Sequence, residues 1–274
     1  MRLGVHLPQF REPVSGEVLA GAARDAEDAG ADDLWVSDHL ILPPGSTAPP
    51  YAFHDALTVL TWAAAATTRA GLGTSVLVVP YRHPVVLAKA LASLDALSGG
   101  RVIAGLASGW MVPELAALGV PFGGRGRRTD EAIACCRALW RGETTFEGLH
   151  VRVSDAGIAP LPARPGGPPV WIGGNSDAGI RRAARLGDAW HTTVCDEPGL
   201  RERLAALDGA LAAEGRDRSA FTVSVRIRAD LERMARVAPR LRALGVDHVL
   251  VDPPAFDARR FGADVAGYRR LAGA

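Results

Sequence analysis

Eight short apolar runs, each followed by a longer stretch of helical character, constrain the fold of this 274-residue chain most strongly. Their Val, Leu and Ile residues stand at successive positions, which is typical of strands buried on both faces of a parallel sheet. The runs are Leu3–Leu7, Asp33–Val36, Leu72–Val79, Val102–Leu106, Val170–Gly173, Ala189–Thr192, Thr222–Arg228 and His248–Val251. The helical stretches include Glu17–Ala29, Ala56–Thr68, Val85–Leu97 and Asp177–Leu186. Eight units leave roughly 34 residues for each strand, loop and helix. This predicts one α/β domain over residues 1–274, a (β/α)8 TIM barrel, with an open doubly wound sheet as the alternative.

Three longer segments interrupt the alternation of strands and helices, and the first of them is expected to overlie the mouth of such a barrel. The Pro/Gly-rich stretch Leu42–Tyr51 follows the second strand, Ser108–Arg128 follows the fourth, and Phe146–Ala163 looks like a small hairpin insertion before the fifth. Barrels of this type carry their chemistry on the loops at the carboxyl ends of the strands.

The charge balance and the cysteines exclude several classes of protein. With 31 basic and 30 acidic residues, the chain has no basic excess for a nucleic-acid or membrane surface. It has no run of ~20 apolar residues, and its first residues do not resemble a signal peptide. Cys135, Cys136 and Cys195 form neither a disulfide framework nor a zinc motif. We expect a soluble, reduced, cytoplasmic protein.

The loop Gly173-Gly174-Asn175-Ser176 is a candidate phosphate site. It follows a buried strand and opens a helix, where free N–H groups and the helix dipole favour an anion. The alternative is a plain turn whose Asn175 or Ser176 caps the helix. No Walker A motif is present, and the run GLGTS enters a strand and not a helix, so it is no Rossmann fingerprint.

Asp38 and His39 close the second predicted strand at the catalytic end of the barrel. A histidine exchanges a proton near neutral pH, and a neighbouring carboxylate can accept from a cofactor N–H. The alternative is a strand-end pair satisfied by loop backbone. His6, His83 and His191 also fall near strand ends, but no metal-binding spacing links them, and no metal site is expected.

Two further features have a functional and a structural interpretation. Arg125, Arg127 and Arg128 are either a solvated flank of a helix or an anchor for an anionic ligand. The segment Leu57–Thr68 is apolar and small nearly all round, so its helix is either wholly buried or covered by a partner subunit. The second interpretation predicts a homodimer.

Four segments resemble the bacterial-luciferase-like superfamily, and within it the F420-dependent oxidoreductases. They are DDLWVSDHL, GLGTSVLVVPYRHPVVLAKALASLDALSGGRVIAGLASGW, RTDEAI and PPVWIGGNSDAGIRRAARLGDAWH. Together they cover most of residues 1–192, in order and at family-like spacing, whereas the C-terminal third resembles the family only as generic barrel sequence.

The resemblance implies that a cofactor ring lies in the barrel mouth beside Asp38 and His39, with His39 as catalytic proton donor or acceptor. It implies a non-prolyl cis peptide at Ser75-Val76, against the ring. The remaining implied cofactor-binding residues contact the phosphate and side chain of the cofactor: Ala107, Ser108, Gly109, Gly173, Gly174, Asn175 and Ser176.

The implied function is hydride transfer between C5 of the deazaflavin F420 and a small organic substrate. The alternatives are an FMN-dependent monooxygenase that uses reduced flavin and O2, supplied by a separate reductase, and a barrel that has lost redox function. Sugar-phosphate dehydrogenases of the group carry a glutamate where Trp110 stands here, so glucose 6-phosphate is not the expected substrate.

Overall fold

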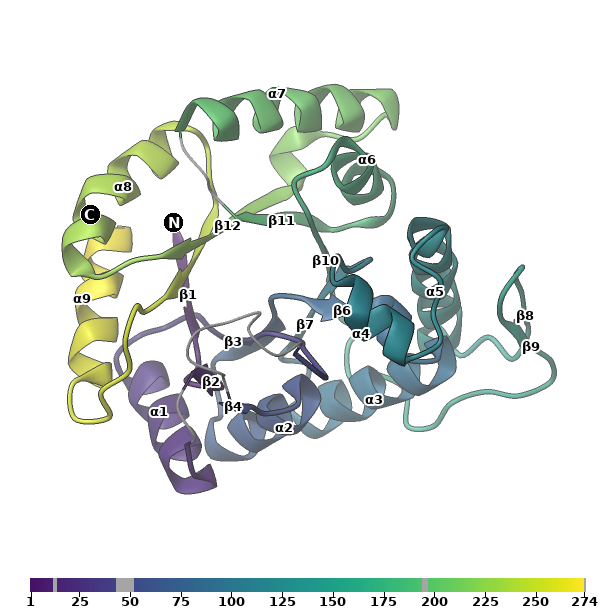
Figure 1. The fold of residues 1–274 in the computed structure, drawn as a ribbon, viewed down its shortest axis with the longest axis horizontal. Coiled ribbons are helices and arrows are strands. Elements are labelled where there is room, and N and C mark those ends of the chain that lie inside the picture. Colours follow the sequence, from purple (N-terminus) through teal and green to yellow (C-terminus); the bar gives the residue numbers. More distant parts are fainter. Residues whose placement is uncertain (12–13, 43–51, 194–196, 274) are drawn as a thin grey trace.

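A computed structural model of the chain describes residues 1–11, 14–42, 52–193 and 197–273. Eight parallel strands close into a barrel in the order β1-β3-β5-β7-β10-β11-β12-β13, with β13 pairing back to β1 (Figure 1). The barrel strands are β1 Arg2–His6, β3 Asp33–Val36, β5 Gly71–Thr74, β7 Val102–Ala107, β10 Val170–Gly173, β11 Ala189–Thr193, β12 Thr222–Arg228 and β13 His248–Asp252. The predicted (β/α)8 barrel is therefore confirmed, and the open sheet is excluded.

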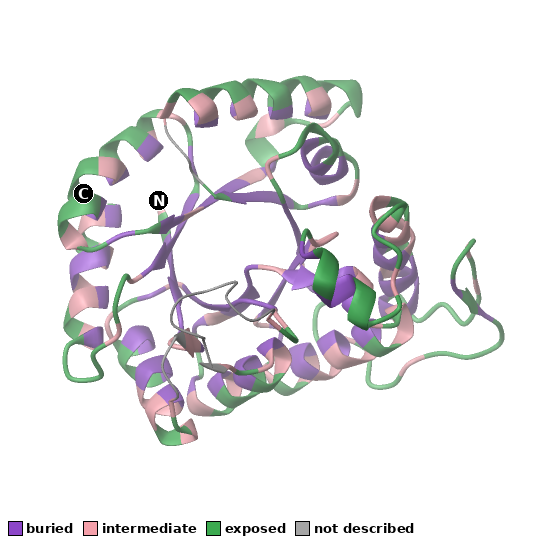
Figure 2. Cartoon of the chain, viewed as in Figure 1, coloured by how far each residue is buried: buried purple, intermediate pink, exposed green. Residues whose placement is uncertain are grey.

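Helices cover the outside of the barrel, and one short helix, α4 Val112–Ala117, lies at its mouth instead. The outer helices are α1 Gly16–Asp28, α2 Ala56–Ala66, α3 Pro84–Leu97, α5 Arg125–Trp140, α6 Asp177–Leu186, α7 Glu197–Ala213, α8 Leu231–Ala243 and α9 Phe261–Gly273. Buried residues lie on the strands and on the inward faces of the helices, while the outward faces are exposed (Figure 2). Side chains of Ser15, Asp55, Ser176 and Asp230 cap four of these helices by accepting from backbone N–H groups of the first turn. The apolar strands thus bury one face against this helical layer and the other inside the barrel.

Side chains fill the ring of strands. Trp35, Trp171 and Leu250 belong to a buried cluster of their own, and glycines on the strands beside β3 make room for the Trp35 indole. A Cβ added at Gly4 would lie 2.4 Å from Trp35 Nε1, and one at Gly73 would lie 2.5 Å from Trp35 Cδ2. The barrel is therefore closed below its mouth, as expected for this fold.

The third predicted strand differs from the structure. In place of one strand over Leu72–Val79, the chain forms β5, a cis peptide at Ser75-Val76, β6 Leu77–Val78 and the short helix η1 Val79–Tyr81. The backbone groups here bond to side chains of the mouth, since the N–H of Val78 donates to Asp38. The cis peptide that the family resemblance implied is present.

Several short elements lie outside the ring of barrel strands. β2 Phe10–Arg11 pairs with β4 Ala52–Phe53, and the expected hairpin insertion forms from β8 Phe146–Glu147 and β9 Arg152–Val153. The remaining element is the short helix η2 Arg218–Ala220 before β12. Most of the predicted mouth segment Leu42–Tyr51 lies outside the described residues.

The sequence predicted that the helix α2 is either wholly buried or covered by a partner subunit. The first of these two interpretations is wrong. Thr58, Thr61 and Ala65 are exposed, and the Trp62 side chain is 53% exposed. In the described part of the chain, no helix combines the length and apolar character needed to cross a lipid bilayer.

Candidate functional site

A pocket of about 500 Å³ opens at the carboxyl ends of β3, β5, β7 and β10, and we call it the mouth pocket. All the site residues predicted from the sequence line it. They are Asp38, His39, Ser75, Val76, Ala107, Ser108, Gly109, Gly173, Gly174, Asn175 and Ser176. Their segments are separated along the chain, so the barrel is what brings them together.

The Asp38 carboxylate is buried and paired with a cation. Arg82 donates to both of its oxygens, over 2.6 and 2.9 Å, and also to Asp55 over 3.0 Å. Burial lowers the pKa of the Arg82 guanidinium, but its bonds to the two aspartates outweigh burial and raise that pKa. Arg82 and Val78 thus fix the position of the carboxylate, and its role as acceptor for a cofactor N–H stays a prediction. Asp38 stabilises the wall of the pocket through its bonds to Arg82 and Val78.

His39 is oriented by a carboxylate that the sequence analysis missed. Its Nδ1 lies 2.8 Å from Oε2 of Glu114, which is fully buried in α4. Since a carboxylate only accepts, Nδ1 carries the proton and Nε2 is left to exchange one with a bound ligand. Trp110 is 70% exposed and meets the His39 ring edge-on, with 6.2 Å between ring centroids.

Glu114 is saturated with donors, which fixes its position. Its Oε1 accepts from the backbone N–H of Leu40 over 2.7 Å and of Ile41 over 3.2 Å. The Tyr81 hydroxyl donates to Oε2 over 2.5 Å, and burial together with this bond raises the pKa of Tyr81 well above its usual value, so it stays protonated. This glutamate lies four residues after Trp110, and its donors hold it against His39.

The other end of the pocket has the features of an anion site. Ser176 caps α6 by accepting from the N–H of Gly179, and Gly174 has a φ of +127°, which favours glycine. A Cβ at Gly173 would lie 2.9 Å from Val76 Cγ1, so a larger residue would close this end. The loop therefore combines a narrow backbone cradle with a helix N-terminus.

Two arginines line this same end. Arg125 donates to the Gly109 carbonyl over 3.0 Å, and the buried Arg182 pairs with Asp130. Of the predicted cluster Arg125, Arg127 and Arg128, Arg125 is the member found among the described lining residues. Of this cluster, Arg125 is therefore the residue that we consider further as an anchor for an anionic ligand.

The floor of the pocket is a buried chain of hydroxyls and imidazoles. Ser75 Oγ lies 2.8 Å from His191 Nε2, and His191 Nδ1 lies 2.8 Å from Ser224 Oγ. Burial, followed by the positive charges that His248 and Arg226 contribute, lowers the pKa of His191 well below its usual value. His191 is therefore a neutral support beneath the pocket. His83 caps α3 instead of facing the mouth.

Arg226 of β12 is a second residue that the sequence analysis missed. Its guanidinium donates to Ser37 Oγ over 2.9 Å, to the Ser75 carbonyl over 3.0 Å and to Asp252 over 3.0 Å. It ties β12 to β3, β5 and β13 across the mouth. Among the described residues, no group of three or more His, Cys, Asp or Glu side chains is placed to hold a metal ion.

The sequence of this chain is similar to those of several known proteins. The luciferase-like monooxygenase family matches residues 1–250. An uncharacterized protein of Mycobacterium tuberculosis is 32% identical over 272 residues, covering 94% of this chain and 93% of its own. An F420-dependent glucose-6-phosphate dehydrogenase of Kineococcus radiotolerans is 35% identical over 217 residues, covering 77% of this chain but 63% of its own.

The fold also matches solved structures. An F420-dependent secondary alcohol dehydrogenase, solved in complex with an F420-acetone adduct, superposes with a TM-score of 0.87 at 17% identity. The match covers 99% of this chain and 98% of that one. At this identity the likeness concerns the fold alone.

Proposed function

The chain belongs to the luciferase-like monooxygenase family, and from that premise we propose that it is an oxidoreductase that binds the deazaflavin F420 in the mouth pocket. When bound, F420 supplies a hydride donor or acceptor at C5 for a small organic substrate. The F420-dependent relatives support this cofactor, and no observation in the structure favours the FMN-dependent monooxygenase over it.

The residues of the mouth pocket fit such a cofactor. The backbone cradle at Gly173–Ser176, the start of α6 and Arg125 would hold its phosphate. Ser75, Val76 and the segment Ala107–Gly109 would line the ring, and Asp38 would support that wall through Arg82. The small or hydroxyl side chains on these strand ends leave room for a flat molecule.

The single observation that carries the proposal is the chain of contacts from His39 to Glu114 and Tyr81. Glu114 holds the His39 ring by its Nδ1, so Nε2 keeps one orientation at the pocket. His39 is half-buried, and an imidazole there can give or take a proton without leaving its position. His39 is the catalytic residue that we assign, and Glu114 is a positioning residue.

The first test is a fluorescence titration of the purified protein with F420 and, separately, with FMN. We expect micromolar or tighter binding of F420 and much weaker binding of FMN. The reverse preference would favour the monooxygenase, and retention of neither cofactor would favour a barrel without redox function.

The second test is His39→Ala. Since general acid-base catalysis contributes roughly 10²–10⁴-fold, turnover should fall at least about 100-fold while the dissociation constant for F420 stays within about threefold. Turnover is followed by cofactor absorbance with the best substrate from a panel of small alcohols and carbonyl compounds. Glu114→Gln, which keeps the shape but not the charge, should lower turnover less and shift its pH profile. Equal losses of turnover and F420 affinity in His39→Ala would make His39 a binding residue.

The remaining proposals concern the location of the enzyme in the cell, its oligomeric state and its partners. We propose that it works in the cytoplasm as a homodimer, with α2 and its exposed Trp62 at the interface. A separate enzyme that reduces the cofactor is a further proposed partner.

A further inference from the structure

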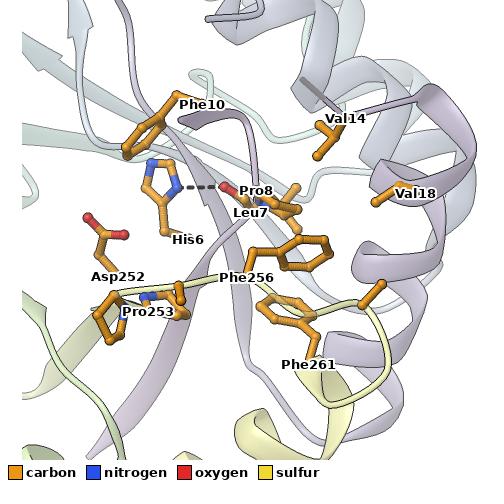
Figure 3. Close-up of a pocket in the computed structure, with 13 residues that line it drawn as sticks. His6, Leu7, Pro8, Phe10, Val14, Val18, Asp252, Pro253, Phe256 and Phe261 are labelled. Carbon is orange, nitrogen blue, oxygen red and sulfur yellow. Dashed lines mark hydrogen bonds between the residues drawn. The ribbon is translucent and has the colours of Figure 1, made fainter. Parts of the chain in front are cut away.

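A second pocket adjoins the mouth pocket. It has a volume of about 390 Å³ and lies between the segments that follow β1 and β13, against the start of α1 and the start of α9 (Figure 3). We call it the apolar pocket. Its walls include Phe10, Val14, Val18, Phe256 and Phe261.

The apolar pocket has a polar end and an apolar end. Figure 3 shows His6 and Asp252 at one end and Val14, Val18, Phe256 and Phe261 at the other. The rings of Phe256 and Phe261 meet edge-on with centroids 5.2 Å apart. Aromatic and aliphatic walls of this kind favour alkyl and aryl groups, and the volume lies within the range of small-ligand pockets.

The polar end forms a wall shared with the mouth pocket. His6 lines the apolar pocket, and its Nε2 lies 2.8 Å from Oγ of Ser37, which lines the mouth pocket. Asp252 lines the apolar pocket and accepts from Arg226, which lines the mouth pocket, over 3.0 Å. One layer of hydrogen-bonded side chains therefore separates the two pockets.

The charges of the described residues that line the apolar pocket disfavour an anionic occupant. Its described lining residues include no Lys or Arg, and the one carboxylate, Asp252, would repel a phosphate. An uncharged group, in contrast, loses little by leaving water and gains from burial against the phenyl rings.

We propose that the apolar pocket is a second binding site, which takes an uncharged compound with an alkyl or aryl arm and is separated from the mouth pocket by the shared wall. The ligands are then neutral alcohols or carbonyl compounds with an apolar arm. This inference does not depend on the proposed function, because the binding of the apolar arm depends on the apolar pocket alone.

The test uses cofactor-free protein and straight-chain methyl ketones of six to ten carbons, with binding measured by isothermal titration calorimetry. Each added methylene should tighten binding about three- to fourfold, as expected for burial of a CH₂ group, until the pocket is full. The heat capacity of binding should be negative, because apolar surface is buried. Affinity that does not change with chain length would overturn the proposal.

A matched pair of variants locates the binding. Val18 is half-buried in the first turn of α1, where an aspartate is favourable for the helix, so Val18→Asp should fold. It should weaken binding of the longest ketone at least tenfold and flatten the dependence on chain length. The control is Val86→Asp on α3, where the valine is 59% exposed, and it should leave both unchanged. Equal effects of the two variants, or none from Val18→Asp, would overturn the proposal.

A parallel titration with F420 separates the two hypotheses. Ketone binding without F420 binding would leave the apolar pocket standing and overturn the proposed function. F420 binding without chain-length-dependent ketone binding would leave the proposed function standing and overturn the proposal for the apolar pocket.

Discussion

The two pockets at the barrel mouth adjoin each other, but different forces hold the walls of each pocket in place. The mouth pocket is built from glycines, hydroxyls and buried ions, such as Asp38 with Arg82. The described lining of the apolar pocket has no glycine, and its shape comes from phenyl rings, prolines and valines. Buried polar groups require specific partners, whereas apolar walls require mainly the right volume. We therefore expect the mouth pocket to be sensitive to single substitutions and the apolar pocket to be tolerant of them.

The largest difference should follow from removing the Asp38 carboxylate. Its side chain is fully buried, and Asp38→Ala leaves the Arg82 guanidinium, 13% exposed, with Asp55 as its remaining carboxylate. Breaking a buried pair by removing one partner is strongly destabilising, so the free energy of unfolding should fall by about 3 kcal/mol or more. Urea denaturation followed by circular dichroism measures this.

The control for that variant is an exposed ion pair of the same residue types. Asp28 pairs with Arg69 over 3.2 Å, and the two side chains are 75% and 66% exposed. Asp28→Ala should change the free energy of unfolding by less than about 0.5 kcal/mol, because exposed pairs contribute little. Similar losses from Asp38→Ala and Asp28→Ala would contradict the view that buried charge holds the mouth pocket.

A smaller effect should appear when the pH is lowered, through His191 in the floor of the mouth pocket. Burial keeps the pKa of His191 well below its usual value, so in the folded state it does not take up a proton in mildly acidic solution. In the unfolded chain the pKa is about 6.5, and the proton binds there. Stability is therefore lost as the pH falls below about 6.5. Between pH 7.5 and 5.5 this one group should account for about 1.4 kcal/mol.

The measurement compares urea denaturation of the wild type and of His191→Gln at the two pH values. The other titrating groups are common to both proteins, so the variant should lose less stability on acidification by the amount given above. The same acid loss in both proteins would mean that His191 takes up a proton while folded.

The sequence predicted most of the framework that carries these pockets. The bounds of Asp33–Val36, Val170–Gly173 and Thr222–Arg228 agree with β3, β10 and β12, because an apolar run buried on both faces is a local signal. The predicted site residues all reach one pocket, because parallel strands of a barrel end at the same rim.

What the sequence did not reveal depends on contacts between distant residues. Arg226 meets Ser75 across 151 positions, and Glu114 meets His39 across 75, so neither pair leaves a periodic pattern. The apolar pocket was missed for another reason. Residues such as Val18 and Phe256 have the same chemistry as core residues, so only the fold distinguishes an apolar wall from an apolar core.

The smallest effect should come from trimming the apolar pocket itself. Phe256 is half-buried, and Phe256→Leu keeps an apolar wall while removing the edge-on contact with Phe261. Such a contact contributes about 0.5–1.5 kcal/mol, so the free energy of unfolding should fall by about 1 kcal/mol. The dissociation constant for F420 should not change, because Phe256 does not line the mouth pocket. A loss as large as that of Asp38→Ala would show that the apolar pocket is part of the rigid core, and the contrast between the two pockets would then fail.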